Sequence, residues 1–355
     1  MRPSSTGADE PLPLSWFDFE LPDELIAQEP VRPRHASRLL CLVRATGAVD
    51  HRAFTDLPSL LAPGDLLVVN RTRVIASRLR LRLPTGGKAE LLCYRPLDGP
   101  LALARRWEAL GKPGRSLVPG RELVAEDGTR VRIEARRGDA FEVSSVSPLL
   151  PLLERAGELP LPPYIKRQAG PGASDITDYQ SVFAREPGAV AAPTASLHFD
   201  SHVNAALVAR GVGFAEVVLH VGPGTFLPVR GEHEADVRRH VMHEEWYEVP
   251  SESRDAIAAV RARGGRIVAV GTTSLRALES WQLSGEPAGM SRLFVYPGFS
   301  FRVVDALVTN FHLPRSTLLM LVAAFAGRER VLAAYAAAVA MRYRFFSYGD
   351  AMWIG

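Results

Sequence analysis

The spacing of hydrophobic and polar residues divides the chain into three regions. The first, residues 16–77, combines a helix-like piece at residues 22–28 with a strand at residues 38–43 and the apolar run DLLVVN at residues 65–70. A helical period beside short apolar runs predicts part of a mixed α/β layer.

The second region, residues 78–147, alternates hydrophobic and polar residues, as strands with one buried face do. The alternation begins with RLRLRL at residues 78–83 and recurs in shorter runs at residues 90–94, 106–110, 122–125, 130–135 and 140–143. Turn-forming pairs such as Gly86-Gly87 and Asp127-Gly128 separate these runs at hairpin spacing. We therefore predict a small all-β barrel inserted into a larger domain.

In the third region, from residue 148 onward, strands alternate with helices. We expect strands at residues 215–220 and 266–270 and helices at residues 251–263, 274–283 and 329–341. Such alternation is typical of α/β layers. The predicted fold class is α/β: a mixed α/β main domain, barrel-like in form, with an inserted small all-β barrel domain. The main domain takes residues 16–77 and 148–355, the insertion takes residues 78–147, and residues 1–15 form a flexible tail.

Composition narrows the functional classes. Hydrophobic residues make up 47% and charged residues 23%, the balance of a soluble globular protein. The net charge is only +3, so a polyanion would be bound by a local patch. The apolar runs are too short to cross a bilayer and the first fifteen residues lack the apolar stretch of a signal peptide. We therefore expect no membrane protein. Cys41 and Cys93 match no metal or redox spacing, which favours a reducing cytoplasm.

Two strand ends carry candidate ligand-binding motifs. In VAVGTTSLRALES, Thr272 and Thr273 open a helix whose free N–H groups are either capped by hydroxyls or available to a carboxylate or phosphate. In LHVGPGTF, Gly222 and Gly224 let a ligand approach the backbone, with Thr225 beside them. A simple turn is the alternative there.

The stretch HVMHEEW holds two histidines and two carboxylates. His240, His243 and Glu244 could bind a metal ion. Because histidine titrates near neutral pH, the same residues could act as general acid and base. A structural cluster is the third interpretation.

Three further stretches combine polar groups with small or aromatic residues. GAVAAPTASLHF leaves room for a flat ligand beside Thr194 and His198, unless it is a buried loop. YRFFSYGDAMWI gathers aromatic rings, which stack bases, around arginine and aspartate, unless it is an ordinary core strand. VTNFHLPRSTLLML places polar residues before an apolar run, where they line a pocket or where Ser316 caps a helix.

Arginines gather at the start of the predicted insertion. Arg78, Arg80 and Arg82 project to the same side of one strand, and Arg71 and Arg73 precede them. They form either a basic face for nucleic acid or a solvated barrel surface.

Taken together, these motifs resemble one known family. The stretches FDFELPDELIAQEP, LLAPGDLLVVNRTRVIASRL, PLPPYIKR, YQSVFAREPGAVAAPTASLHF and YPGFSFRVVDALVTNFHLPRSTLLMLVAAFAG, with the motifs above, are similar to the S-adenosylmethionine:tRNA ribosyltransferase-isomerases of queuosine biosynthesis. The resemblance covers nearly all of residues 17–352. It implies that the ribosyl moiety of S-adenosylmethionine is transferred and isomerised onto 7-aminomethyl-7-deazaguanine at the tRNA wobble position, with release of adenine and methionine.

The resemblance also implies partners and residue roles. The partners are S-adenosylmethionine and a tRNA with a GUN anticodon, without a metal, and the protein acts as a monomer. The proton carriers and their partner are expected to be His243, His312 and Glu245. The nucleoside and methionine are expected to contact Gly222, Gly224, Thr225, Thr272, Thr273, Arg276, Thr309 and Asn310. The tRNA is expected to contact Thr194, His198, Arg344, Tyr348, Asp350, Arg73 and Arg78.

Two other functions remain open from the residues alone. One is a metal-dependent hydrolase that uses His240, His243 and Glu244. The other is a non-catalytic RNA-binding protein that uses the arginine strand and the C-terminal aromatic residues.

Overall fold

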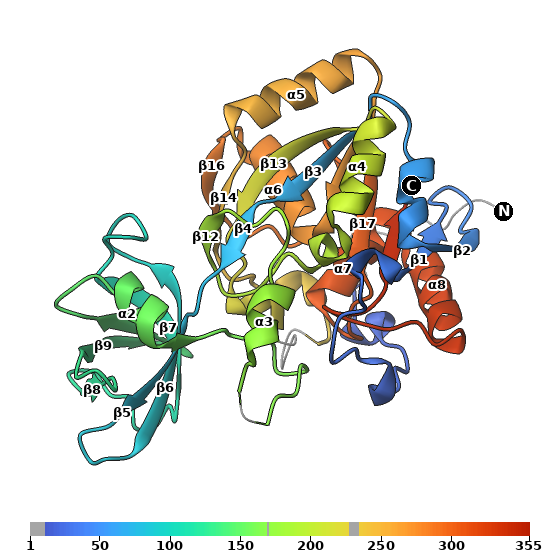
Figure 1. The fold of residues 1–355 in the computed structure, drawn as a ribbon. Helices are drawn as coiled ribbons and strands as arrows, with labels where there is room; N and C mark the ends of the chain where they lie inside the picture. Colours follow the sequence, from blue (N-terminus) through green and yellow to red (C-terminus); the bar gives the residue numbers. More distant parts are fainter. Residues whose placement is uncertain (1–10, 169, 227–233) are drawn as a thin grey trace.

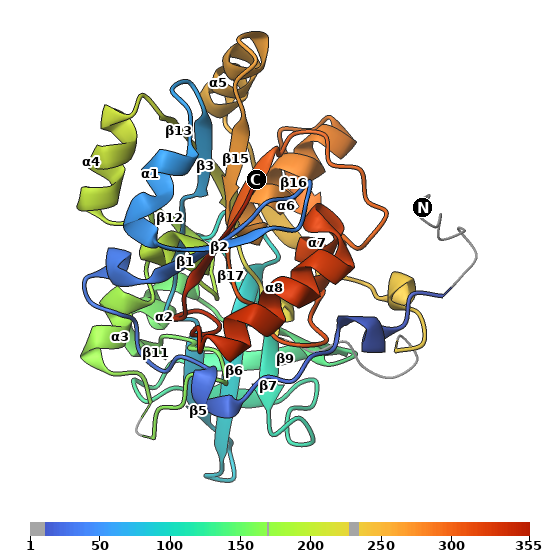
Figure 2. The ribbon, with the colours of Figure 1, turned by 90° about the vertical axis from the view of Figure 1, so that its right-hand side faces the viewer.

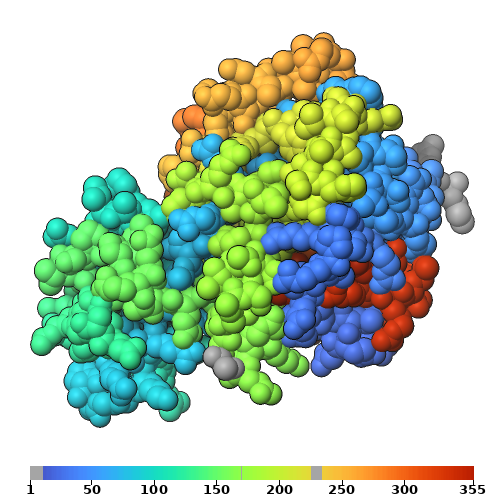
Figure 3. All heavy atoms as spheres, in the orientation of Figure 1, coloured from blue at the N-terminus to red at the C-terminus, as the bar shows by residue number. Residues whose placement is uncertain are grey.

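The computed structural model describes residues 11–168, 170–226 and 234–355, without the side chains of Thr225 and Phe226. It contains a large α/β body and a smaller all-β unit beside it (Figure 1). The space-filling view shows this unit as a separate lobe (Figure 3). The predicted fold class, α/β with a mixed main domain and a small all-β barrel, is confirmed, but the main domain is not barrel-like, because its nine-stranded sheet is open.

The main sheet has nine strands in the order β16-β14-β13-β3-β15-β17-β18-β1-β2. Their bounds are β1 Arg38–Leu42, β2 Val49–Ala53, β3 Leu66–Asn70, β13 Gly213–Leu219, β14 Glu245–Glu248, β15 Ile267–Val270, β16 Ala288–Ser291, β17 Ala306–Asn310 and β18 Ala351–Ile354. Strands β13, β3, β15 and β17 run parallel, and every residue of β3, β15 and β17 is buried. Strands with both faces covered require such apolar runs, which explains DLLVVN.

Helices cover the two faces of the main sheet (Figure 2). Helices α1 Leu57–Leu60 and α4 Ser201–Ala209 lie on one face. The other face carries α5 Ser251–Ala262, α6 Gly271–Ser284, α7 Thr317–Ala326 and α8 Arg328–Ala340. Leu66 and Val68 of β3 point into one core, and Leu67 and Val69 into the other.

The smaller unit is a closed six-stranded barrel. Its strands are β5 Arg78–Arg82, β6 Lys88–Pro96, β7 Arg106–Lys112, β8 Glu122–Val124, β9 Arg130–Arg137 and β10 Ala140–Ser144. They pair in the order β5-β6-β7-β10-β9-β8, and Arg82 opposite Val124 closes the ring. The inserted unit is therefore a closed barrel, whereas the main sheet is open and has β16 and β2 as its edge strands.

The barrel recruits the segment that follows it. Helix α2, Leu150–Ala156, places Leu152 and Leu153 in the barrel core, and the short strand β11, Gly157–Glu158, pairs with β5. We propose that the inserted unit extends through β11, beyond the boundary at residue 147 expected from periodicity.

The remaining elements are short. Strands β4 Thr72–Val74 and β12 Glu186–Ala189 pair in parallel, and α3 spans Ala173–Asp178. Short 3-10 turns cover η1 Leu14–Phe17, η2 Asp23–Leu25, η3 Arg34–Ala36, η4 Phe54–Asp56, η5 Thr194–His198, η6 Pro223–Phe226 and η8 Val237–Arg239.

Two local predictions near the N-terminus need correction. The helix-like piece at residues 22–28 is only the 3-10 turn η2, since Ile26 after it has an extended backbone. Leu14, placed in the expected flexible tail, is 1% exposed and belongs to the main core, whereas residues 1–10 lie outside the described part.

Candidate active site

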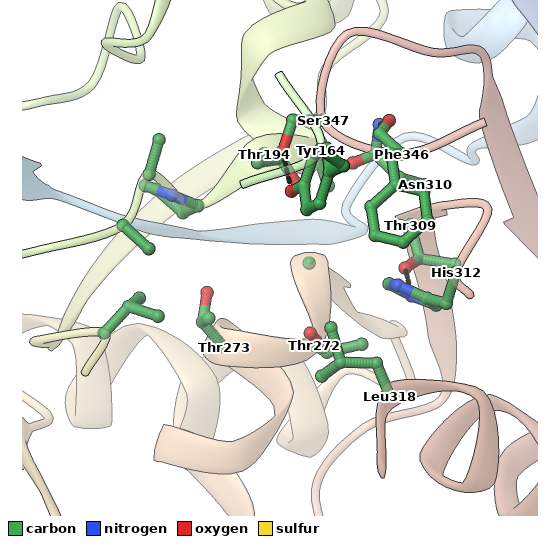
Figure 4. Close-up of a pocket in the computed structure, with 16 residues that line it drawn as sticks. Tyr164, Thr194, Thr272, Thr273, Thr309, Asn310, His312, Leu318, Phe346 and Ser347 are labelled. Carbon is green, nitrogen blue, oxygen red and sulfur yellow. Dashed lines mark hydrogen bonds between the residues drawn. The ribbon is translucent and has the colours of Figure 1, made fainter. Parts of the chain in front are cut away.

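A pocket lies at the carboxyl ends of the parallel strands. Loops that follow the strands of such a sheet leave a crevice there, which is where α/β proteins bind ligands. Val221 follows β13, Gly271 follows β15, and Asn310 ends β17, and all three line the pocket. Figure 4 draws the lining side chains around this cavity. The full lining is Tyr164, Ala191, Ala192, Pro193, Thr194, Ala195, Val221, Gly271, Thr272, Thr273, Thr309, Asn310, His312, Leu318, Phe346 and Ser347.

The start of helix α6 faces this pocket without a side-chain cap. The residue before the helix is Val270, which cannot cap it, and the Ser274 hydroxyl donates to the Val270 carbonyl oxygen at 2.8 Å. The Thr273 hydroxyl is buried and has no hydrogen-bond partner among the described residues. The capping interpretation of the threonines is therefore wrong, and the first N–H groups of α6 remain available to an anion.

Asn310 contributes a second free polar atom. Its side-chain nitrogen donates to the Phe346 carbonyl oxygen at 3.1 Å and to His198 Nε2 at 3.0 Å. Its oxygen is buried and has no partner in the described part of the chain. A buried acceptor without a donor costs about 1–3 kcal/mol, which a ligand that donates an N–H or O–H would recover.

His312 lies in the pocket wall as a neutral imidazole. Its Nε2 lies 2.9 Å from the Thr309 hydroxyl, and its backbone N–H donates to the Tyr335 hydroxyl. Burial lowers the pKa of His312 to about 3. The ring is therefore unprotonated at neutral pH, the form that a base must have, but its affinity for a proton is small.

An aromatic pair forms another wall of the pocket. The rings of Tyr164 and Phe346 lie 4.2 Å apart, and the Tyr164 hydroxyl lies 2.7 Å from the Ser347 hydroxyl. Phe346 has a φ of 72°, an unfavourable backbone conformation for a bulky residue and one that is concentrated at functional sites. We did not predict Tyr164, Phe346 or Ser347, although two of them belong to the aromatic C-terminal stretch.

The small residues of GAVAAPTASLHF do leave room in the pocket. Ala191, Ala192 and Ala195 line it together with Thr194, whose predicted proximity to a ligand agrees with this position. His198, from the same stretch, is buried behind Asn310 and has both ring nitrogens in hydrogen bonds. Direct contact of His198 with a tRNA base, as predicted, is incompatible with this arrangement.

A buried ion pair adjoins the pocket. Glu245 and Arg276 form a salt bridge with side chains only 3% and 4% exposed. Glu245 also accepts the Gly222 N–H at 2.8 Å, and the Arg276 Nε donates to the Leu293 carbonyl oxygen at 3.1 Å. We expected Glu245 to pair with a histidine or with ribose, and Arg276 to hold a carboxylate. Instead, the two side chains neutralise each other. An unpaired buried charge would be strongly unfavourable, so neither side chain is free for the predicted partner.

The remaining residues of the glycine and histidine motifs lie outside the pocket lining. A Cβ on Gly224 would come within 2.8 Å of the His243 ring, so this glycine makes room for His243 and not for a ligand. His243 is exposed, and the side chain of Thr225 lies outside the described residues.

The structure gives the proposed metal ligands other contacts. Both oxygens of Glu244 are engaged, one with Arg95 at 2.9 Å and one with Arg292 at 2.8 Å. The His240 ring packs edge-on against Phe294. In residues 11–168, 170–226 and 234–355, no group of three or more His, Cys, Asp or Glu residues is arranged to hold a metal ion.

The C-terminal residues predicted to meet tRNA serve partly structural roles. Asp350 is 2% exposed and accepts hydrogen bonds from the backbone N–H groups of Arg38 and Arg344. The Arg344 side chain donates to the Glu29 carbonyl oxygen. The Tyr348 hydroxyl is buried and has no hydrogen-bond partner in the described part of the chain, and burial raises the pKa of Tyr348.

The two predicted arginines near the barrel differ in availability. Arg78 is half-buried, donates to the Leu161 carbonyl oxygen at 3.3 Å and lies 3.6 Å from a Glu90 oxygen. Arg73, on β4, borders a groove between the main domain and the barrel. None of the described helices has the length and apolar character needed to span a bilayer.

Comparisons with known proteins agree with this architecture. Residues 14–354 match the family described as Queuosine biosynthesis protein. Two proteins named S-adenosylmethionine:tRNA ribosyltransferase-isomerase, from Anaeromyxobacter sp. (strain Fw109-5) and Anaeromyxobacter dehalogenans (strain 2CP-C), are 59% and 56% identical, each over 96% of this chain and 98% of the relative. The crystal structure of S-adenosylmethionine tRNA ribosyltransferase from Thermotoga maritima is 40% identical, with a TM-score of 0.54 over 96% of this chain and 100% of that one.

Proposed function

The chain belongs to the queuosine biosynthesis protein family, and from this premise we propose that it is an S-adenosylmethionine:tRNA ribosyltransferase-isomerase. It transfers the ribosyl moiety of S-adenosylmethionine to 7-aminomethyl-7-deazaguanine at the wobble position of a tRNA with a GUN anticodon and isomerises it, giving epoxyqueuosine. Adenine and methionine leave. The protein acts as a monomer in the cytoplasm and without a metal.

One observation carries the assignment of the pocket. The Asn310 oxygen and the Thr273 hydroxyl are both buried, both lack partners among the described residues and both belong to residues that line the pocket. Native proteins rarely leave buried polar atoms unpaired, and a ligand in the adjoining pocket would supply partners for these two. The adenosine part of S-adenosylmethionine supplies hydroxyl and amine groups that can pair with both.

The methionine part fits the start of helix α6. Its carboxylate would accept from the uncapped N–H groups near Thr272 and Thr273, where the helix dipole favours negative charge. Among the described residues, the pocket lining contains no Asp, Glu, Lys or Arg. The sulfonium would therefore meet no opposing charge in the lining, and its full effect on the acidity of the neighbouring C–H would be retained.

His312 is the imidazole available for proton transfer in this lining. A base that removes a proton beside the sulfonium must be unprotonated, and the low pKa of His312 meets that condition at neutral pH. His243, exposed beside Gly224, is the second candidate and would act when the tRNA covers it.

The barrel offers contacts for the tRNA backbone. Arg82 and Lys88 are exposed and lie directly opposite each other on β5 and β6. Like charges in such a pair repel, and a phosphate would relieve the repulsion. Arg73 borders a separate groove, between residues 154–159 and the main domain, where a further backbone phosphate could bind.

Release of adenine tests the proposal directly. The purified protein is incubated with S-adenosylmethionine and a tRNA that carries 7-aminomethyl-7-deazaguanine, and adenine and methionine are separated by chromatography. We expect stoichiometric release of both with the modified tRNA and none with tRNA that carries guanine. Binding of tRNA without adenine release would favour the RNA-binding alternative, and activity that requires added zinc would favour the hydrolase.

A further inference from the structure

His198 lies behind the pocket wall and has a hydrogen bond at each ring nitrogen. Nδ1 lies 2.8 Å from the Ser37 hydroxyl, and Nε2 lies 3.0 Å from the Asn310 side-chain nitrogen. The ring packs against Phe54, with centroids 5.1 Å apart, and the residue is only 4% exposed. The imidazole therefore has no freedom to turn toward a ligand.

These contacts determine the hydrogen-bond direction at Asn310. The Phe346 carbonyl oxygen can only accept, so the amide group of Asn310 must present its nitrogen there. The same nitrogen then donates to His198 Nε2, which must be unprotonated, and the ring proton lies on Nδ1 facing Ser37. Burial also lowers the pKa of His198 to about 4, which agrees with a neutral ring.

The consequence is an acceptor with a fixed orientation in the pocket. With both hydrogens of the amide nitrogen used, the oxygen is the free group that Asn310 presents, and it has no partner among the described residues. Reversing the amide would place an oxygen against the Phe346 carbonyl oxygen and against the lone pair of Nε2. The pocket therefore favours a donor at this position and opposes an acceptor.

The surroundings of Asn310 suit a flat heterocycle. Phe346, whose carbonyl oxygen orients the amide, forms an aromatic wall with Tyr164, and Ala191 and Ala192 leave space beside it. Flat rings pack well against aromatic faces. Adenine and deazaguanine both carry N–H donors, but only adenine belongs to a small ligand that can enter a buried pocket whole.

We propose that His198 is a positioning residue that holds the Asn310 amide with its oxygen toward the pocket, so that the pocket selects the 6-amino group of the adenine of S-adenosylmethionine. The inference rests on the proposed function and extends it to the basis of cosubstrate selectivity. Neither His198 nor Ser37 contacts the cosubstrate.

The test compares S-adenosylmethionine with S-inosylmethionine, in which a 6-oxo group replaces the amine. Dissociation constants are measured by calorimetry on the full chain without tRNA. The wild-type protein is expected to bind the adenosine form about 100-fold more tightly, because the inosine oxygen would face the Asn310 oxygen without a proton between them. Asn310→Ala is expected to reduce this ratio to near one.

Variants of the buried histidine separate positioning from structure. His198→Leu removes the acceptor that orients the amide, and we expect the ratio to fall below about 10, since a freed amide can present its nitrogen to the inosine oxygen. His198→Gln can present an acceptor oxygen to Asn310 and is expected to restore most of the ratio. Ser37→Ala is a smaller change that removes the hydroxyl facing His198 Nδ1. If His198→Leu does not fold, the binding ratio of Ser37→Ala tests the inference in its place.

Three outcomes would overturn the inference. Equal binding of the two cosubstrates by the wild type would show that the amine is not recognised. A ratio of 100 that persists in folded His198→Leu and Ser37→Ala would reduce His198 to a structural role. If Asn310→Ala raised KM for the tRNA but left the affinity for S-adenosylmethionine unchanged, the deazaguanine would be the donor. In each case adenine release by the wild type would still support the proposed function, and its absence would count against that function instead.

Discussion

The pocket and the barrel surface are both rich in polar groups, but their polar groups are satisfied in different ways. In the barrel, arginines pair with carboxylates at the surface, as Arg80 does with Glu158 and Arg130 with Glu122. In the part of the pocket lining that the structure describes, no side chain is charged, and the Asn310 oxygen and the Thr273 hydroxyl are buried without partners among the described residues. Unpaired buried atoms also occur elsewhere, as at Arg78 Nε on β5, so the comparison shows that the ligand site is marked by such atoms in residues that line a cavity and not by the density of charge.

The largest expected effect would break the buried ion pair beside the pocket. Glu245→Ala leaves the Arg276 charge unpaired and the Gly222 N–H without its acceptor, so we expect the free energy of unfolding to fall by about 3–5 kcal/mol. Urea denaturation measures it. Glu122→Ala in an exposed barrel pair is the matched control and should cost less than about 1 kcal/mol. Equal losses would remove the distinction between the two regions.

A second substitution tests the unpaired oxygen itself. Asn310→Ala should lower kcat/KM for adenine release about 100-fold, corresponding to about 3 kcal/mol, because a group that pairs with the ligand is lost. The folded protein should lose about 1–3 kcal/mol of stability, because the Phe346 carbonyl oxygen and His198 Nε2 lose their donor while an unsatisfied oxygen is removed. Retained activity together with a sharp fall in melting temperature would show that Asn310 is structural, and the contrast between the pocket and the barrel would then be wrong.

Acid should weaken the main domain before the barrel. All nine histidines lie outside residues 78–147. The pKa is lowered to about 4 for His198 and His220 and to about 3 for His312, in each case first by burial. Below the ordinary histidine pKa of about 6.5, the unfolded chain binds protons that the folded chain does not. The free energy of unfolding therefore falls as the pH drops from 6.5 toward 4. Each of these histidines lowers it by up to about 1.4 kcal/mol for each pH unit.

Hydrogen exchange, read separately for peptides of the two regions, measures this difference. We expect faster exchange in the main sheet at pH 5 than at pH 7, after correction for intrinsic rates, and little change in the barrel. His220→Gln should flatten the dependence of main-domain stability on pH. A barrel that loosens first would contradict the assignment.

The smallest effect is expected on the barrel surface. Replacing Arg82 and Lys88 together by serine should raise KM for tRNA by about tenfold or less and reduce the salt dependence of binding, because each phosphate contact releases counterions. Affinity for S-adenosylmethionine should not change. Arg136→Ser, at the other end of β9, is the control, and an equal effect there would indicate general charge loss and not a binding face.

The elements of the fold were largely predictable because each is encoded by local periodicity. Strict alternation identified the barrel strands, and the helical period identified α5, α6 and α8 within a few residues. The prediction of a helix-like piece at residues 22–28 was wrong, because this short segment forms only one turn of 3-10 helix. Likewise, Leu14 looked like part of a tail because nothing in its neighbours reveals the distant core that buries it.

The amino-acid sequence by itself determined the two-part architecture, the family and the polar residues that end the parallel strands, because spacing and motif are properties of neighbouring residues. Only the tertiary structure decided which of those groups are free. Glu245 meets Arg276 across 31 positions, and His198 meets Asn310 across 112. In such pairs, each charge or hydrogen-bonding group is paired with a group from a distant part of the chain. The role of a polar residue therefore depends on contacts that local sequence does not encode.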